Sequence, residues 1–363
     1  MIYIVSLQYS PVFKSLCYAL GNQLQNEGKV IKYILSSHYD WMIPKKQNVE
    51  FIGNSKDIKT IFRDSVNYNN FKKIKELFLE NKPETVYFFN IHPFYNYYIA
   101  RIVKQYGGKV IQHVHEPYVG DKIHYGKFQR CWLYLFEYIQ ALILKKSDVA
   151  ILSSKEAWNL FNKRYPDFEG KKIMIPLLYE DNGKNVSIKS NHRTYLNFIG
   201  PPVLAKGPEK FLNIVEQCQV TDLNFLLISR MKITDKKYYQ YDNLEIFYHE
   251  KISDDLIAKF MKKSIMTITP YKTARQSSVA STAFMCGTPV LATNINGLNE
   301  VVDHKITGYL VDKDASVDEW LDGVIYIKNN IEDLSNNCRD FFKTHYSEIN
   351  WPKYFKEVFE IEA

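Results

Sequence analysis

The sequence predicts an α/β protein made of two doubly wound domains in tandem. Its 363 residues exceed the usual size of one domain, about 100 to 200 residues, and suggest two. Short apolar runs alternate with helical patterns in both halves, which is typical of parallel strands joined by crossover helices. A polar stretch at 181–193 separates the halves and predicts a linker.

The first half contains the strand-like runs IYIVSL, VIKYIL, TVYFF, VIQHVH and VAILS. Helical patterns at Lys14–Gln25 and Pro93–Tyr106 lie between them. Gly28 and the pair Gly107 and Gly108 stand where these helices should end, because glycine adopts the left-handed cap conformation at low steric cost.

The second half has the strand-like runs YLNFIG, FLLIS, LEIFY, IMTITP and PVLATN. Its helical patterns fall at 207–218, 253–263, 278–286 and 317–330. Open parallel sheets bind ligands beyond the carboxyl ends of their strands. Functional residues are therefore expected in the strand-to-helix turns.

Composition narrows the class of protein. Apolar residues make up 46% and charged residues 24%, as in compact globular proteins. The five cysteines are scattered and the first residues resemble a strand more than a signal peptide, so a reducing cytoplasm is the expected location. A net charge of +7 favours an anionic partner, but no nucleic-acid-binding signature is visible and nucleic acid is not expected.

The segment 265–311 is the most informative part of the chain. Its strand IMTITP ends at a proline, and Ser277 and Ser278 then start a helix whose free amides and dipole favour an anion such as a diphosphate. Gly287 ends this helix and lets it pack closely on the strand PVLATN. Ordinary strand–helix–strand packing explains the same pattern, so these residues alone leave both interpretations open.

The run CGTPVLATNINGLNEVVDHKITGYLV resembles the donor-binding half of retaining GT-B glycosyltransferases, family 4 or group 1 type. Weaker similarity at NFIGPPVLAKGPEKFL, HVHEPY, SDVAILSS and NWPKYFKEVFE extends it over most of the chain. The resemblance implies two Rossmann-like domains facing a cleft, an acceptor-binding domain at 1–182 and a nucleotide-sugar-binding domain at 190–345. It also implies that a closing helix at about 346–363 packs back on the first domain.

The resemblance places Gly200 and Lys206 in the loop that contacts the donor diphosphate. A lysine there would stabilise charge on the leaving nucleotide, so Lys206 is expected to act in both binding and catalysis. The family has an arginine after the glycine, whereas Pro201 follows here. The site then has either one cation or a second one supplied by Arg230 or Arg275. The remaining donor-binding candidates are Gln276, Ser277, Ser278, Thr282 and Glu300.

Two histidines alternate on the run VIQHVH and should share one face of their strand. His115 matches the family's active-site histidine and is expected to be catalytic. A structural pair with His113 is the alternative. A metal site including Glu116 is not expected, because no companion ligand cluster accompanies it and GT-B enzymes need no metal aspartates.

The main departure from the family concerns two glutamates that normally contact the sugar and the ribose. Ala274 and Thr282 occupy their positions, and only Thr282 retains a hydrogen-bonding group. Because the glutamates are missing, the sequence does not predict which sugar the donor carries. Their absence also motivates an alternative from another class, a non-catalytic partner subunit of another glycosyltransferase.

The resemblance implies a hexosyl-type transferase that uses a UDP- or GDP-linked sugar as substrate and no separate cofactor. The expected acceptor is a growing glycan, free or lipid-linked, of a bacterial-type surface polysaccharide, with retention of configuration. Nucleotide-sugar epimerisation uses the same architecture but is less consistent with the matched segments. The aromatic run at 127–146 predicts a buried crossover helix; the alternative is an interfacial helix at the inner face of a membrane.

Overall fold

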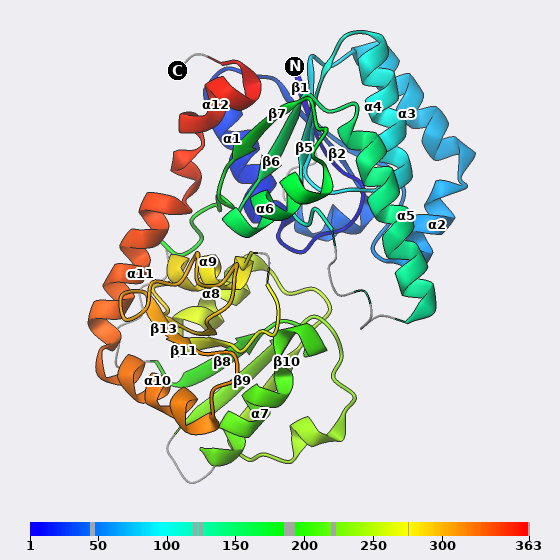
Figure 1. Ribbon diagram of the computed structural model, residues 1–363. Coiled ribbons are helices and arrows are strands. Elements are labelled where there is room, and N and C mark those ends of the chain that lie inside the picture. The colour runs from blue at the N-terminus through cyan, green and yellow to red at the C-terminus, as the bar shows by residue number, and fades with distance from the viewer. Residues whose placement is uncertain are drawn as a thin grey trace. The chain divides into compact units, whose positions relative to one another are not determined.

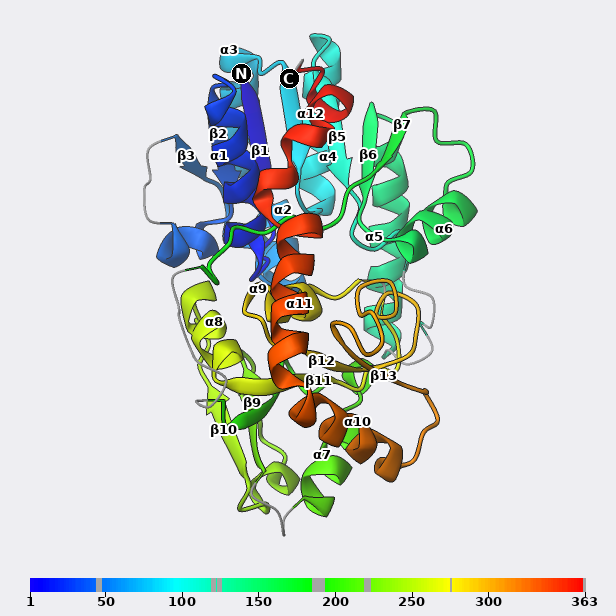
Figure 2. The same cartoon turned by 90° about the vertical axis from the view of Figure 1, so that its left-hand side faces the viewer.

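The structure is a computed structural model that describes residues 1–43, 48–118, 122, 126–184, 193–218, 223–274 and 276–361. The chain divides into two compact units. The N-terminal unit comprises Met1–Glu180 together with Glu348–Ala363, and the C-terminal unit comprises Asp181–Ser347. Figures 1 and 2 show a sheet flanked by helices in each of them.

The N-terminal unit has a seven-stranded parallel sheet with strand order β3-β2-β1-β4-β5-β6-β7. Its central strands are buried on both faces, as near-continuous apolar runs predict. The strands are β1 (Ile2–Ser6), β2 (Ile31–Leu35), β3 (Val49–Phe51), β4 (Thr85–Phe88), β5 (Lys109–His113), β6 (Val149–Leu152) and β7 (Lys171–Met174).

Helices α3, α4 and α5 cover one face of this sheet and share its main apolar core, while α1 and α12 (Pro352–Phe359) lie on the other side in Figure 1. His92 caps α4, accepting a hydrogen bond from the Tyr95 amide, and Pro93 occupies the first helical position. The helices are a π-helical turn (Lys14–Tyr18) that continues into α1 (Ala19–Asn26), a 3-10 helix (Ser37–Met42), α2 (Ile58–Ser65), α3 (Tyr68–Asn81), α4 (Pro93–Gln105), α5 (Lys127–Leu144) and α6 (Lys155–Arg164).

The C-terminal segment belongs to the N-terminal unit. Its helix α12 (Pro352–Phe359) follows a 3-10 turn at Glu348–Asn350 and is shorter than the predicted closing helix. The Glu348 amide donates a 3.0 Å hydrogen bond to the Tyr179 carbonyl. Lys109 Nζ lies 2.7 Å from a Glu360 carboxylate oxygen, so contacts at both ends hold the segment to the unit.

The C-terminal unit has a six-stranded parallel sheet with strand order β10-β9-β8-β11-β12-β13. The strands are β8 (Tyr195–Ile199), β9 (Asn224–Ser229), β10 (Leu244–Tyr248), β11 (Ser264–Thr269), β12 (Val290–Thr293) and β13 (Gly308–Val311). The helices are α7 (Pro208–Gln217), α8 (Asp254–Lys262), α9 (Ser278–Met285), α10 (Val317–Asn329) and α11 (Ile331–His345), with 3-10 turns at Leu204–Lys206 and Lys236–Tyr239.

The chain is firmly tied where it enters the C-terminal unit. Arg339 of α11 forms a bidentate ion pair with Asp181 and also donates to the Met285 carbonyl. Lys262 of α8 donates to the Gly183 carbonyl, and a Cβ on Gly183 would collide with the Met285 carbonyl oxygen. The predicted linker therefore begins with a fixed segment; its residues 185–192 lie outside the described residues.

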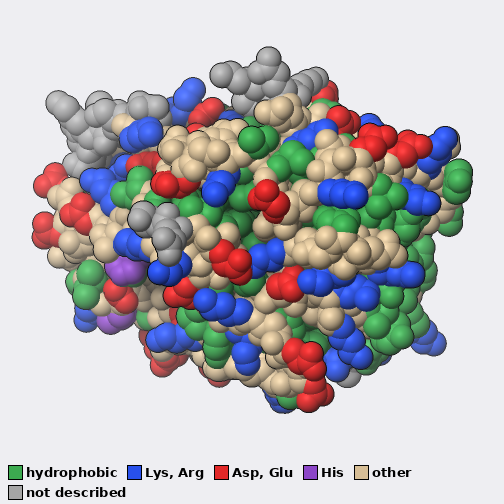
Figure 3. Space-filling model, turned by 90° about the horizontal axis from the view of Figure 1, so that it is seen from above, with side chains coloured by type: hydrophobic (Ala, Val, Ile, Leu, Met, Phe, Trp, Pro, Cys, Tyr) green, Lys and Arg blue, Asp and Glu red, His purple; other side chains and the backbone are tan. Residues whose placement is uncertain are grey.

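The predicted fold class, two doubly wound Rossmann-like sheets, is confirmed. In each sheet the strand order reverses beside the first strand, between β1 and β4 and between β8 and β11. These are the switch points at which such sheets bind ligands. No helix among the described residues is long and apolar enough to cross a membrane. On the face in Figure 3, Lys and Arg are interspersed with Asp and Glu, so the surplus of positive charge forms no single-sign field there.

Candidate functional site

The strongest candidate site lies at the carboxyl edge of the C-terminal sheet, where β8 leads into α7. Gly200 follows β8 with φ +121°, and its amide donates a 2.8 Å hydrogen bond to the Ile228 carbonyl. A 3-10 turn ends at Lys206, and Gly207 then adopts the left-handed conformation with φ +61°. Glycine is required at these two backbone conformations, because other residues are strained there.

Lys206 reaches back over this loop. Its Nζ atom lies 3.5 Å from the Ile199 carbonyl oxygen and 5.4 Å from the centre of the Tyr271 ring, close enough for a cation–π contact. Among the described residues no carboxylate lies within ion-pair distance of it. Burial lowers the pKa of Lys206 to about 8, although the side chain keeps some exposure to solvent. A half-buried ammonium without an acidic partner is suited to receive an anion.

The loops after β8 and β11 are joined into one surface. The Lys272 amide donates a 2.8 Å hydrogen bond to the Ala205 carbonyl. A Cβ on Gly207 would collide with the Pro270 carbonyl oxygen, so only glycine permits this approach. Tyr271, buried beneath the lysine, was missed by sequence reasoning; its place directly after the strand IMTITP was the available signal.

Helix α9 starts beside this surface. Ser277 is its N-cap and accepts a 3.2 Å hydrogen bond from the Ala280 amide, and Ser278 is the first helical residue, as predicted. The Thr282 hydroxyl donates a 2.7 Å hydrogen bond to the Ser278 carbonyl, so a ligand would meet it as an acceptor. Gln276 and Ala274 are half-buried just before the helix, and Arg275 lies outside the described residues.

Arg230 and Glu300 interact with other parts of the C-terminal unit. Arg230 follows β9 and donates a 2.7 Å hydrogen bond from Nη2 to the Ile252 carbonyl, which holds it to the loop before α8. Its Nε is buried without a hydrogen-bond partner. Glu300 lies near Tyr346, where its charge adds to burial in raising the pKa of that phenol. No hydrogen bond or ion pair among the described residues joins either to Lys206.

The histidine pair belongs to the N-terminal unit, at the carboxyl end of β5. The rings of His113 and His115 stack with centres 4.1 Å apart, so they share one face as the alternation predicts. His113 is buried between the Tyr87 hydroxyl and Ser153 Oγ, each 2.7 Å from a ring nitrogen. His115 donates a 2.8 Å hydrogen bond from Nε2 to the Phe89 carbonyl and is partly exposed.

Burial keeps both rings neutral at pH 7. It lowers the pKa of His115 to about 4 and that of His113 well below its usual value. Because Nε2 of His115 carries the proton donated to Phe89, Nδ1 is the nitrogen able to accept one. Among the described residues, no group of three His, Cys, Asp or Glu side chains could hold a metal ion.

A buried tyrosine fixes the neighbouring loop after β1, and sequence reasoning missed it. The Tyr39 hydroxyl donates a 2.8 Å hydrogen bond to the Gln8 carbonyl and accepts one of 2.6 Å from the Ser10 amide. It also lies 2.8 Å from Ser6 Oγ. This loop is therefore pre-formed at the β1/β4 switch point.

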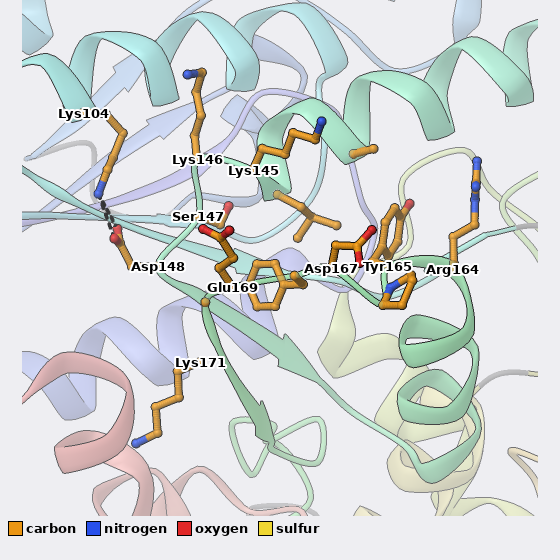
Figure 4. A pocket seen from close by; sticks show the side chains of 15 residues that line it. Lys104, Lys145, Lys146, Ser147, Asp148, Arg164, Tyr165, Asp167, Glu169 and Lys171 are labelled. Atoms are coloured by element: carbon orange, nitrogen blue, oxygen red, sulfur yellow. Dashed lines mark hydrogen bonds and ion pairs between the residues drawn. The ribbon is translucent and has the colours of Figure 1, made fainter.

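A hollow of about 910 Å³ in the N-terminal unit lies at the opposite, amino edge of its sheet (Figure 4). Residues before β6 and at the start of β7 line it, and Lys104 and Asp148 form a 2.7 Å ion pair on its wall. Both cations and carboxylates line it. None of the predicted site residues lines this hollow, so its size alone does not make it the functional site.

Comparison with known proteins supports the predicted relationship. Residues 182–343 match the family described as glycosyl transferases group 1. An uncharacterized glycosyltransferase of Methanocaldococcus jannaschii is 26% identical over 226 residues, which cover 61% of this chain. That alignment covers 59% of the relative, less than two thirds of its length.

Solved structures resemble the whole chain. Sucrose-phosphate synthase from Thermosynechococcus elongatus matches with a TM-score of 0.73 at 14% identity, and Anabaena HepE in complex with UDP-glucose with 0.74 at 12%. Each match covers 99% of both chains. At such identities the similarity concerns the fold, which is that of the GT-B glycosyltransferases.

Proposed function

We propose that this protein is a glycosyltransferase that moves a sugar from a nucleotide-sugar donor to a growing glycan. One observation carries the proposal: Lys206, a half-buried cation without a carboxylate partner among the described residues, lies at the β8/β11 switch point, inside the stretch that matches the group 1 family. Anabaena HepE has been solved with UDP-glucose, which makes UDP-sugars the first donors to test.

The donor diphosphate would lie against the loop at Lys206 and the first turn of α9. Gly200 leaves room there for the lysine. The amides of Ser277 and Ser278 lie at the N-terminal end of α9, which favours anions. Gln276 and Thr282 offer neutral contacts to the ribose or sugar. Glu300 and a second cation, Arg230 or Arg275, complete the proposed set, and no separate cofactor is required.

In the transfer, the bond between the anomeric carbon and the diphosphate oxygen breaks, a bond to an acceptor hydroxyl oxygen forms, and the proton of that hydroxyl passes to the departing diphosphate. Lys206 would stabilise the charge that develops on the departing diphosphate. Neutral His115 would orient the reacting groups from the N-terminal unit through Nδ1. The resemblance to retaining enzymes supports retention of configuration and a hexosyl donor.

The proposed acceptor is a glycan of a bacterial-type surface polysaccharide, free or lipid-linked. The pre-formed loop held by Tyr39 lies at the switch point of the N-terminal sheet, which is where an acceptor would be selected. A cytoplasmic location is part of the same proposal. The five cysteines, all within the described residues, form no disulfide, which suits a reducing compartment.

A donor screen tests the proposal. UDP, GDP and their hexose derivatives are each added at millimolar concentration, and both the melting temperature and nucleotide release are measured. A bound nucleotide raises the melting temperature by mass action, whereas the free sugar should have little effect. Donor binding is refuted if no nucleotide raises it.

The alternative is a non-catalytic partner subunit of another glycosyltransferase. It is favoured by Ala274 and Thr282, which stand where the family has glutamates, and by the commitment of the Thr282 hydroxyl to the Ser278 carbonyl. Tight nucleotide binding without nucleotide release over the whole donor panel would establish this alternative. Slow release from any donor would refute it.

A further inference from the structure

Helix α5 is apolar on both of its faces. Trp132, Ile139 and Ile143 are buried against the unit. On the opposite side Phe128 is 67% exposed, Tyr134 61%, Leu135 37% and Tyr138 62%. Residues 128, 131, 135 and 138 follow the spacing of one helical stripe, so the exposed side chains form a continuous band. A helix that only covers the sheet would carry polar residues there.

Helix α2 packs next to this exposed side of α5. Phe62 is 38% exposed, and its ring packs edge-to-face on Trp132 with centres 4.9 Å apart. Because Trp132 is buried, this contact packs α2 on α5 and places Phe62 beside the exposed side chains of α5. We call the exposed side chains Phe128, Cys131, Tyr134, Leu135 and Tyr138 the aromatic band. Such a contiguous exposed apolar surface generally marks a contact site.

The charges around the aromatic band are positive. Lys127 and Lys145 are exposed at the two ends of α5, and Arg130 is half-exposed between them. The helix contains one carboxylate, Glu137, which is buried and lies 2.7 Å from Lys122 Nζ. The exposed surface of α5 therefore combines aromatic rings with cations and presents no acidic side chain.

We propose that the aromatic band docks on an anionic lipid bilayer. The rings would enter the headgroup layer, where tyrosine is favoured because it has an apolar body and a polar tip, and the lysines would approach lipid phosphates. The helix lies on the surface because it is too short and too polar to span a bilayer. A second copy of the chain fits less well, since a symmetric contact would bring the same cations together.

Docking of this kind is independent of transferase activity. If the proposed function holds, it would bring the protein to a lipid-linked acceptor, and that consequence alone rests on the proposed function. Vesicle binding by the protein without donor or acceptor tests the surface itself. Failure of docking and failure of catalysis are then seen in separate experiments.

The experiment is co-sedimentation with large unilamellar vesicles of phosphatidylcholine, with and without phosphatidylglycerol. The full chain should bind the vesicles that contain phosphatidylglycerol, and high salt should release it because the attraction to the headgroups is screened. Phe128→Ser combined with Tyr138→Ser should lower the partition coefficient by roughly tenfold or more, since both rings leave the interface. Lys127→Glu should lower binding to anionic vesicles alone.

The matched control replaces two equally exposed side chains of the C-terminal unit, Tyr239→Ser with Ile325→Ser, which are 62% and 57% exposed. The control should bind as the original chain does, and all variants should keep its melting temperature. An equal loss in the control, or no binding to anionic vesicles, overturns the proposal. So does a dimer, seen by light scattering, that the Phe128 and Tyr138 changes dissociate while vesicle binding is unaffected.

Discussion

The Nζ atom of Lys206 occupies the space that a side chain at position 200 would need: a Cβ on Gly200 would collide with it. Gly200 also has φ +121°, a conformation that other residues rarely adopt. One glycine thus fixes the loop backbone and makes room for the cation. The proposed diphosphate site depends on both residues, and each can be tested separately.

Lys206→Ala should weaken binding of a nucleoside diphosphate by roughly 10- to 100-fold, since a hydrogen bond to a charged group contributes about 1.5 to 3 kcal/mol. The melting temperature should change little, because among the described residues Nζ makes one long hydrogen bond, of 3.5 Å, and a cation–π contact with Tyr271. Calorimetric titration with UDP and GDP measures the affinity of the Lys206→Ala variant, with Lys272→Ala on the adjacent loop as the control. An unchanged affinity would show that the phosphates are held elsewhere.

Gly200→Ala should also weaken nucleotide binding, because the new methyl group displaces the end of the flexible lysine side chain. Gly207→Ala makes a contrasting variant. Its Cβ would meet the Pro270 carbonyl oxygen, which belongs to the backbone and cannot move aside as a side chain can. Thermal melts should therefore show the larger loss of stability for position 207. Equal melting temperatures would contradict this account of the loop.

Nucleotide affinity should fall as pH rises through about 8. Lys206 is cationic below its lowered pKa of about 8 and neutral above it, and a bound diphosphate favours the cation. Binding near pH 8 should therefore take up a proton, seen as a dependence of the heat of binding on the buffer. Lys206→Met should flatten the pH dependence between pH 7 and 9.5. If the variant keeps the full dependence, another group is responsible.

His115→Ala should lower turnover by about 10² to 10⁴-fold, the usual effect of losing a positioned catalytic group, while nucleotide affinity remains unchanged. His113→Ala is the control. This change removes the partner of the Tyr87 and Ser153 hydroxyls. It should therefore lower the melting temperature more than the turnover rate. Steady-state kinetics and thermal melts separate the two effects. Normal turnover of the His115 variant would make that histidine structural.

Stability should fall as pH drops from about 6.5 towards 4. Burial lowers the folded-state pKa of His92 and of His115 to about 4, below the unfolded value, so the neutral forms contribute stability above pH 6.5 that is lost on acidification. For fully buried His92 the loss is about 2 kcal/mol by pH 5. Urea denaturation at several pH values measures the free energy of unfolding. The His92→Asn change should reduce the slope of this free energy against pH. An unchanged slope would exclude His92 as a source.

Local pattern was enough to predict most strands and the helices at Pro93–Tyr106, 253–263 and 278–286. Helices α2, α3, α6 and α11 were not predicted, because each buries only two or three residues and its apolar positions are therefore sparse. The shared face of His113 and His115 followed from strand alternation.

Contacts between distant loops could not be predicted. Tyr271 meets Lys206 because β8 and β11 are neighbours in the sheet, which the order of strands along the chain does not reveal. Arg230 was a candidate second cation, but its guanidinium is engaged by the Ile252 carbonyl, and only the folded loop shows this. The sequence shows at which edge of a sheet a residue lies, but it does not show which other side chains that residue contacts.

The N-terminal unit needs residues from both ends of the chain, and this constrains how it is made. Its helix α12 is translated only after the whole segment Asp181–Ser347. At about 5 to 20 residues per second, the ribosome needs roughly 10 to 30 s for that interval. During this time the first 180 residues lack the partners of Lys109 and of the Tyr179 carbonyl, so the nascent N-terminal unit stays incomplete until Glu348 and Glu360 have been added.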